Sequence, residues 1–342
     1  MSLQSSVTRF SLFVVSVAFV GAIGFLPAFA VSNGPENPKC VQAPNDPYDP
    51  AKMITFGLYK GKCVDSSDKR PARVISENDQ EIVIANFLHM GRFWIAHIPK
   101  DSVDAVTFRI DPFGSGIPFI TAAHTLIRFD LKAGKEITLQ GQYAGEEALV
   151  DTDALKVNSF FFSVNYMAPK GVSYNLFPGM ASEYPEAMNF LSAHDRGNAH
   201  EGSKYKEQDL LLTLPEGGGD LFLAQAIKKS AAEGMDAAYN TYSENCTTAL
   251  FDIMDTSIPY GHAVKRFTMS RWRIIDPIAG PSIKALKERG LLAQNYGQKP
   301  GKNSDDKKPD APTEDGPGDG TKLMQMPVQG QPVSQLDPQS QH

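Results

Sequence analysis

One cysteine of the sequence stands where a helix is predicted to begin. Apolar residues follow Cys246 at helical spacing as far as Met254, which predicts an amphipathic helix with Cys246 at the head of its buried face. Ser243 or Asn245 would cap this helix, so Cys246 falls in its first turn. Unpaired backbone amides and the positive end of the helix dipole favour a thiolate there. The chemistry indicated is that of a cysteine nucleophile; the alternative is a buried, inert cysteine that packs as a small apolar residue.

A cysteine nucleophile needs a base, and His124 is the histidine that best suits this role. It lies in the apolar, strand-like stretch ITAAHTLIRF, where two alanines leave room beside the imidazole. The alternative is a core histidine without a catalytic role. The other histidines fall in turns, polar loops, edge strands or the C-terminal tail. Among them His262 is the second choice of base, because it follows the cysteine closely in sequence.

Short strand-like runs must position His124. Six of them lie between about residues 73 and 143, rich in β-branched and aromatic residues and separated by Gly, Asp, Asn and Pro. The stretch Lys132-Ala133-Gly134-Lys135 predicts a tight hairpin between the last two. The register of that hairpin puts Tyr143 roughly opposite His124, which makes Tyr143 a candidate to orient the imidazole. Arg128 lies further along the same face as His124.

The neighbours of Cys246 have two interpretations. The backbone amide of Cys246, at a helix start, is a candidate donor to an oxyanion. Asn245 flanks the nucleophile and is a candidate orienting or oxyanion group, although capping of the helix is the interpretation that we favour.

The pattern of elements predicts the fold class. Residues 150–205 are mixed, with one strand candidate (SFFFSVNYM), and helices are predicted at 220–233, 243–255 and from 283. Strands followed by helices, without strict alternation, indicate an α+β fold with an antiparallel sheet packed with helices, over residues 71–294. Residues 31–70 form an irregular arm. Residues 295–342 are of low complexity, and we expect a disordered tail.

The first 30 residues have the three parts of a secretory signal. Arg9 precedes the apolar run from Phe10 to Leu26, and the small-residue triplet Ala28-Phe29-Ala30 follows. We expect cleavage after Ala30; the alternative is a retained membrane anchor. The sequence therefore predicts a periplasmic or secreted protein without an integral membrane span after cleavage.

Cysteine usage and charge agree with export. Cys40 and Cys63 lie close together in loop-like sequence and predict one disulfide, which leaves Cys246 as the unpaired thiol. A formal net charge of −6 gives no basic footprint for nucleic acid. No C-x-x-C, H-x-x-x-H or H-E-x-x-H spacing predicts a metal site, and no cofactor is expected.

Two stretches carry a family resemblance. AHTLIRF at 123–129 and YNTYSENCTTALFDIMD at 239–255 resemble the two hallmark motifs of the Lnb N-terminal periplasmic domain family, and the segment between them is also similar. The resemblance covers about residues 80–260. Ala123 stands where many members carry glycine, and the charged middle motif reads YKEQD, without the expected arginine.

The resemblance implies a circularly permuted papain-like fold, similar to the lecithin:retinol acyltransferase group, in which the histidine strand precedes the cysteine helix. It implies a cysteine-dependent hydrolase or acyltransferase that acts on an amide, ester or thioester bond, with His124 and Cys246 as the catalytic pair. The implied partner is an envelope substrate, either lipid-linked or a peptide. The alternative is a catalytically inactive periplasmic binding or assembly factor with the same fold.

Overall fold

The computed structural model describes residues 40–114, 121–146, 156–200, 206–268, 279–293 and 296. The signal expected at 1–30 and, except for Tyr296, the tail expected at 295–342 lie outside these residues. The chain divides into two units, Met1–Tyr296 and Gly297–His342, and the second of them lies wholly outside the described residues.

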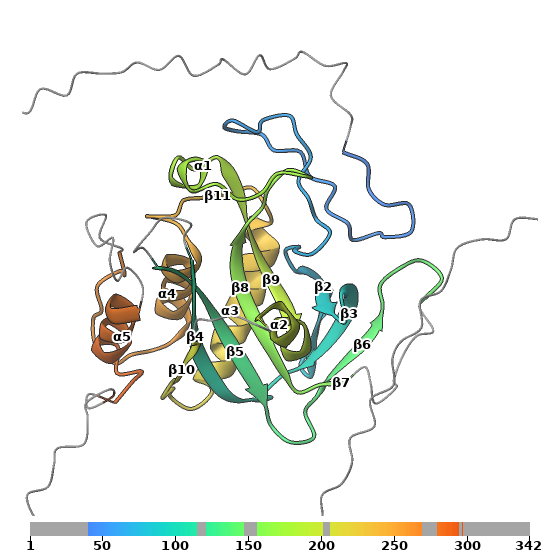
Figure 1. Ribbon diagram of the computed structural model, residues 1–342. Coiled ribbons are helices and arrows are strands. Elements are labelled where there is room, and N and C mark those ends of the chain that lie inside the picture. The colour runs from blue at the N-terminus through green and yellow to red at the C-terminus, as the bar shows by residue number, and fades with distance from the viewer. Residues whose placement is uncertain are drawn as a thin grey trace, which may run out of the picture. The chain divides into compact units, whose positions relative to one another are not determined.

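The first unit contains one large sheet and five helices among its described residues (Figure 1). The strands are β1 (Arg73–Glu77), β2 (Glu81–His89), β3 (Arg92–Pro99), β4 (Val103–Gly114), β5 (Thr121–Leu131), β6 (Ile137–Gly141), β7 (Lys156–Val157), β8 (Ser159–Tyr166), β9 (Tyr184–Ser192), β10 (Gln208–Leu211) and β11 (Ala238–Tyr239). The helices are α1 (Leu176–Met180), α2 (Ala193–His200), α3 (Gly218–Glu233), α4 (Cys246–Ser257) and α5 (Ala279–Glu288).

The sheet is mostly antiparallel. Its order is β10-β4-β5-β8-β9-β2-β3-β6-β7, with β1 paired to β2 and β11 paired to β9. The β2–β9 pair is parallel, and the other pairs are antiparallel. The expectation of an α+β fold with an antiparallel sheet packed with helices is confirmed at this level.

The prediction that β5 and β6 form a hairpin is wrong. The turn itself is present, since the amide of Lys135 donates to the carbonyl of Lys132 at 3.0 Å and Gly134 has a φ of 76°. After the turn, however, β6 pairs with β3 and β7, whereas β5 pairs with β4 and β8. Four strands separate β5 from β6, so the residues of β6 are not neighbours of His124.

Helices lie on both faces of the sheet, with α2 in front of it and α3 behind it in Figure 1. Aromatic contacts join the rear helices to the sheet: Phe222 of α3 meets Phe129 with ring centroids 5.6 Å apart, and Phe251 of α4 meets Phe108 at 5.7 Å. On the other face, Arg196 of α2 forms an ion pair with Asp111 of β4. The main core therefore lies between the sheet and α3 and α4.

The N-terminal arm from Cys40 to Arg70 contains no helix or strand, and two features hold it in place. The predicted disulfide between Cys40 and Cys63 is present. Buried Arg70 forms an ion pair with buried Asp46 and lies over the ring of Phe93 at 4.1 Å. The arm is thus attached to the sheet by packing and charge as well as by its internal crosslink.

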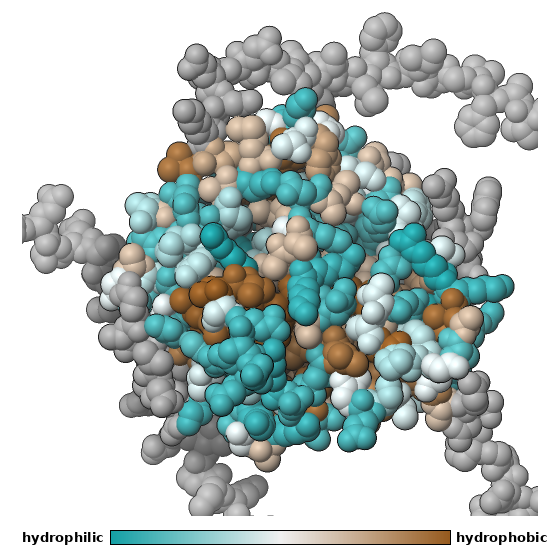
Figure 2. All heavy atoms as spheres, turned by 180° about the vertical axis from the view of Figure 1, so that it is seen from behind, coloured by the Kyte–Doolittle hydropathy of each residue, from teal (hydrophilic) through white to brown (hydrophobic). Residues whose placement is uncertain are grey.

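The surface seen from behind is mainly hydrophilic, with hydrophobic side chains gathered in a few places (Figure 2). Among the described residues, the exposed large apolar side chains include Val74 and Ile75 of β1 and Leu211 of β10. None of the helices in the described ranges has the length and apolar character needed to cross a membrane.

Candidate functional site

The start of α4 is fixed by a capping box. The side chain of Asn245 accepts hydrogen bonds from the amides of Thr247 and Thr248, at 2.9 and 3.1 Å, and the hydroxyl of Thr248 accepts one from the amide of Asn245. Of the two predicted caps, the helix therefore uses Asn245. Within the described part of the chain, no acceptor binds the amide of Cys246, the first residue of α4.

Two successive residues of β5 hold the sulfur of Cys246. His124 and the backbone and hydroxyl of Thr125 interact with the thiol and lower its pKa, and the hydroxyl of Thr247 lies 3.9 Å from the sulfur. The hydroxyl of Thr125 lies 3.0 Å from that of Thr247, which ties the same point of β5 to the first turn of α4. Cys246 is only 4% exposed. The helix start and the histidine strand, far apart in the sequence, therefore meet at the thiol.

The electrostatics of this site favour the thiolate. Burial raises the pKa of Cys246, but the charge of His124, its hydrogen bond and the two bonds from Thr125 lower it by more, to about 6. A free thiol titrates at about 8.5, so a large fraction of Cys246 is ionised at neutral pH. An inert core cysteine would show the opposite shift, because burial alone disfavours the charged form.

The imidazole of His124 has a second partner on its other side. Its Nε2 lies 2.7 Å from the hydroxyl oxygen of Ser163 in β8, the strand next to β5. Ser163 in turn accepts a hydrogen bond from the side-chain amide of Asn165 at 3.0 Å. His124 is half-buried, and Ser163 is buried. The ring is therefore held between the helix start and the neighbouring strand.

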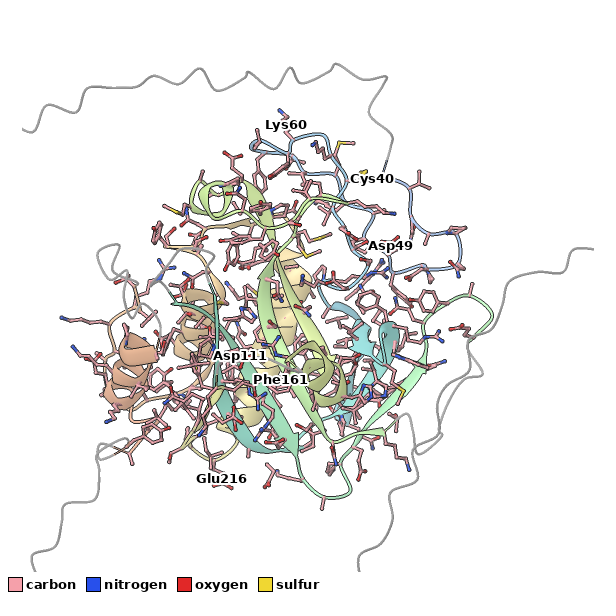
Figure 3. The ribbon with its side chains drawn as sticks, in the orientation of Figure 1. Cys40, Asp49, Lys60, Asp111, Phe161 and Glu216 are labelled. Carbon is pink, nitrogen blue, oxygen red and sulfur yellow. A yellow bond between two sulfur atoms is a disulfide. The ribbon has the colours of Figure 1, made fainter. Side chains whose placement is uncertain are left out.

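Asp111 lies directly opposite His124 in the β4–β5 pair. Its carboxylate is buried and forms an ion pair with Arg196, whose own pKa burial lowers to about 10. Figure 3 labels Asp111 of β4 and Phe161 of β8, the two strands that flank β5. Opposing residues of an antiparallel pair have their Cβ atoms about 5 Å apart, so the charge of Asp111 is close to the imidazole.

A cluster of tyrosines lines the site on the side of β9 and β11. Tyr239 is buried and forms a hydrogen bond with the sulfur of Cys246; its pKa is raised well above the ordinary value by burial and by the charge of the thiolate. Its ring meets that of Tyr166 with centroids 6.2 Å apart, and Tyr166 in turn meets Tyr174 at 4.4 Å. Tyr166 also lines a pocket of about 150 Å³ whose other wall includes Lys69 of the arm.

A buried carboxyl group lies within electrostatic reach of the thiol. Glu186 of β9 is 6% exposed. Burial and the charge of Glu233 raise its pKa to about 8, against the opposing charge of Lys229. The group is therefore largely protonated and neutral at pH 7, and the charge of Cys246 contributes to this shift.

The structure separates the residues proposed from the sequence. Cys246, His124 and Asn245 come together. Tyr143, the candidate orienting group, lies near Arg92, whose guanidinium is 5.0 Å from its ring, because β6 pairs with β3. Arg128 forms ion pairs with Asp130 and Asp209.

His262, the second choice of base, is exposed and follows the C-terminal end of α4, the opposite end of the helix from Cys246. Its ring nitrogens lie 2.9 Å from the carbonyl of Tyr260 and 3.0 Å from that of Glu288. These contacts join the segment after α4 to the end of α5.

Three groups at the site were not anticipated from the sequence: Ser163, Tyr239 and Glu186. Ser163 could have been found from the sequence. Successive side chains of the strand SFFFSVNY point to opposite faces, which puts Ser159, Phe161 and Ser163 on one face. Tyr239 and Glu186 reach the thiol only through the pairing of β11 with β9, which has no local signature.

One comparison with known proteins gives a match. A sequence model described as the Lnb N-terminal periplasmic domain matches residues 92–277, more than half of the chain, and this range includes both His124 and Cys246. No curated protein and no solved structure gives a match. The family description is that of a periplasmic domain, which supports an extracytoplasmic location. The chain belongs to the Lnb N-terminal periplasmic domain family.

Proposed function

We propose that this protein is an exported cysteine-dependent hydrolase or acyltransferase, with residues 71–294 as the catalytic domain. The observation that carries the proposal is the position of the buried Cys246 thiol at the start of α4 beside His124, whose charge and hydrogen bond lower the pKa of that thiol. The substrate is an amide, ester or thioester of the cell envelope, lipid-linked or peptidic. The order of the two motifs, with the histidine strand before the cysteine helix, supports a circularly permuted papain-like arrangement.

The reaction proceeds in two halves. The thiolate of Cys246 attacks the acyl carbon, a C–S bond forms, and the leaving group departs with the proton held by His124. Water or a second nucleophile then gives its proton to His124 and bonds to the acyl carbon, and the C–S bond breaks to restore the thiolate. Water as the second nucleophile gives hydrolysis, and an amine, alcohol or thiol gives acyl transfer.

The helix start supplies an oxyanion site for both halves. The cap uses the amides of Thr247 and Thr248, which leaves the amide of Cys246 for the oxygen that becomes negative in the tetrahedral intermediate. The positive end of the α4 dipole supports the same charge. Asn245 thus contributes by holding the first turn of the helix.

The test is the pH dependence of Cys246 ionisation in the folded full chain. The ultraviolet absorbance of the thiolate, corrected with Cys246→Ser, should titrate near the value of about 6 given by the site. His124→Ala should move the midpoint toward about 8.5, the value of a free thiol. Iodoacetamide labelling of the only unpaired cysteine among the described residues should follow the same two profiles.

A thiol that does not titrate and stays unlabelled until denaturant is added would make Cys246 a core residue. The protein would then be a binding or assembly factor with this fold. A thiol that ionises near the predicted value regardless of His124→Ala would retain the nucleophile but exclude His124 as its base.

A further inference from the structure

His124 must be held in one tautomer if it is to act as a base toward Cys246. A neutral imidazole carries its proton on only one of its two nitrogens. The nitrogen that faces the thiol has to be the unprotonated one before the proton is taken, so the other nitrogen must carry N–H. A group that accepts this N–H would fix both the tautomer and the angle of the ring.

We propose that Ser163 is this positioning residue, an inference that rests on the proposed function of the Cys246–His124 pair. The hydroxyl of Ser163 accepts the proton of Nε2 at 2.7 Å, which leaves Nδ1 as the ring nitrogen that bonds the thiol. In the thiolate–imidazolium pair Nε2 still carries its proton, so the contact with Ser163 persists through the whole cycle.

The neighbours of Ser163 determine which hydrogen bonds its hydroxyl oxygen accepts. The side-chain amide of Asn165 donates to the same hydroxyl at 3.0 Å and also to the side-chain oxygen of Asn189 in β9. A serine oxygen accepts two hydrogen bonds, and the bond from Asn165 leaves one place for Nε2–H. Ser163 and Asn189 are 5% and 3% exposed, so water does not easily replace either contact. This row of side chains crosses three neighbouring strands, β5, β8 and β9.

A neutral orienting group has a specific chemical effect. A carboxylate in this position would stabilise the imidazolium by its charge, whereas a hydroxyl fixes the ring without adding charge. Asp111 of β4, the acidic residue opposite His124, has its charge balanced by Arg196. The thiolate of Cys246 therefore remains the main charge that stabilises the imidazolium, and the two ions of the pair depend on each other.

The experiment compares Ser163→Ala with Ser159→Ala. Ser159 lies on the same strand and face, and its hydroxyl donates to Asp130 at 2.7 Å, so the control also loses one hydrogen bond. Nitrogen NMR of the imidazoles reads the hydrogen bond made by Nε2–H in the imidazolium that pairs with the thiolate; the chain has seven histidines, and comparison with His124→Ala assigns the signal of His124. Iodoacetamide labelling at about pH 7 gives the reactivity of Cys246.

We expect Ser163→Ala to shift the Nε2–H signal of His124 toward that of a ring nitrogen without an acceptor and to slow labelling roughly tenfold, the size of effect of a lost hydrogen bond to a charged group. Ser163→Thr, which keeps the hydroxyl, should restore both readouts, and Ser159→Ala should change neither. If Ser163→Ala keeps the Nε2–H signal and the labelling rate of the unchanged protein, the inference is overturned.

Two further arms keep the result decisive. If Ser163→Ala does not fold, Asn165→Ala takes its place: slower labelling than in Ser159→Ala supports the proposal, and equal labelling overturns it. If His124→Ala changes the labelling profile and Ser163→Ala does not, this inference fails alone. If His124→Ala has no effect either, the proposed catalytic pair fails as well.

Discussion

Tyr239 donates a hydrogen bond from its hydroxyl group to the sulfur of Cys246. The donor lies on β11 and the sulfur at the start of α4, and the segment between them contains Asn240, whose amide and carbonyl bond the backbone of Glu244. This short loop turns the chain back, so that the two side chains meet.

We expect Tyr239→Phe to raise the pKa of Cys246 by about one unit, because a hydrogen bond to the charged form is lost. The thiolate absorbance titration measures this directly. Tyr242→Phe is the matched control, since among the described residues its hydroxyl has no hydrogen-bond partner. Equal titration curves for Tyr239→Phe and the unchanged protein would show that the contact does not stabilise the thiolate.

The cap of α4 allows stability and thiol ionisation to be separated. Asn245→Ala removes the acceptor for two amides and should lower the free energy of unfolding by about 1 kcal/mol, measured by urea denaturation. Asn245→Asp keeps that acceptor and should cost less. Its negative charge lies beside Cys246, however, and should raise the thiol pKa. If Asn245→Ala and Asn245→Asp changed the free energy of unfolding and the thiol pKa in the same proportion, this separation would be contradicted.

Glu186 predicts a pH dependence of stability. Its folded pKa of about 8 is above its ordinary value of 4.5, so the folded state binds the proton more tightly than the unfolded state does. Stability from this group is present below about pH 4.5 and is lost as the pH rises to about 8. Glu186→Gln does not titrate, so its stability relative to the unchanged protein should increase through this window.

At its steepest, the difference in the free energy of unfolding between Glu186→Gln and the unchanged protein changes by about 1.4 kcal/mol per pH unit, the value for one proton. Urea denaturation at several pH values measures it. Glu216, labelled in Figure 3, is exposed. Glu216→Gln therefore serves as the control and should give a curve parallel to that of the unchanged protein. Parallel curves for Glu186→Gln as well would mean that the carboxyl is ionised in the folded protein.

The disulfide of the arm should contribute measurably to stability. Cys40 and Cys63 are 23 residues apart, and closing a loop of this size stabilises a folded protein by about 3 kcal/mol in the chain-entropy model. The double variant Cys40→Ser and Cys63→Ser should lose roughly this amount in thermal or urea unfolding. An unchanged midpoint would show that docking through Arg70 and Asp46 suffices without the crosslink.

Local patterns in the sequence identified the elements whose periodicity is clear. The alternation of β6 is confirmed, with Ile137 and Leu139 buried, and the apolar spacing after Cys246 matches the buried face of α4. By contrast, β9 was not predicted. Pro185, Glu186 and Asn189 interrupt its pattern, although almost every residue of this strand is buried. A strand in the middle of a sheet is stabilised by its neighbours, and a single sequence does not identify them.

The same distinction applies to the site. Cys246 and His124 could be proposed because each has a local signature, a helix start and small neighbours in a strand. Tyr143 was placed by assuming that a turn joins paired strands, and the turn at Gly134 exists without that pairing. Turn chemistry fixes the local path of the backbone, whereas strand partners depend on which apolar faces match across the whole sheet.

The three cysteines place a condition on the order of folding. One disulfide formed among three thiols can be any of three, and only the Cys40–Cys63 pair leaves Cys246 reduced. In the folded unit α4 and β5 enclose Cys246, which keeps it apart from Cys40 and Cys63 of the arm. The chain avoids the two wrong pairings if this enclosure forms before the arm is oxidised. Early folding around the thiol would thus protect the group that is most easily lost to mispairing.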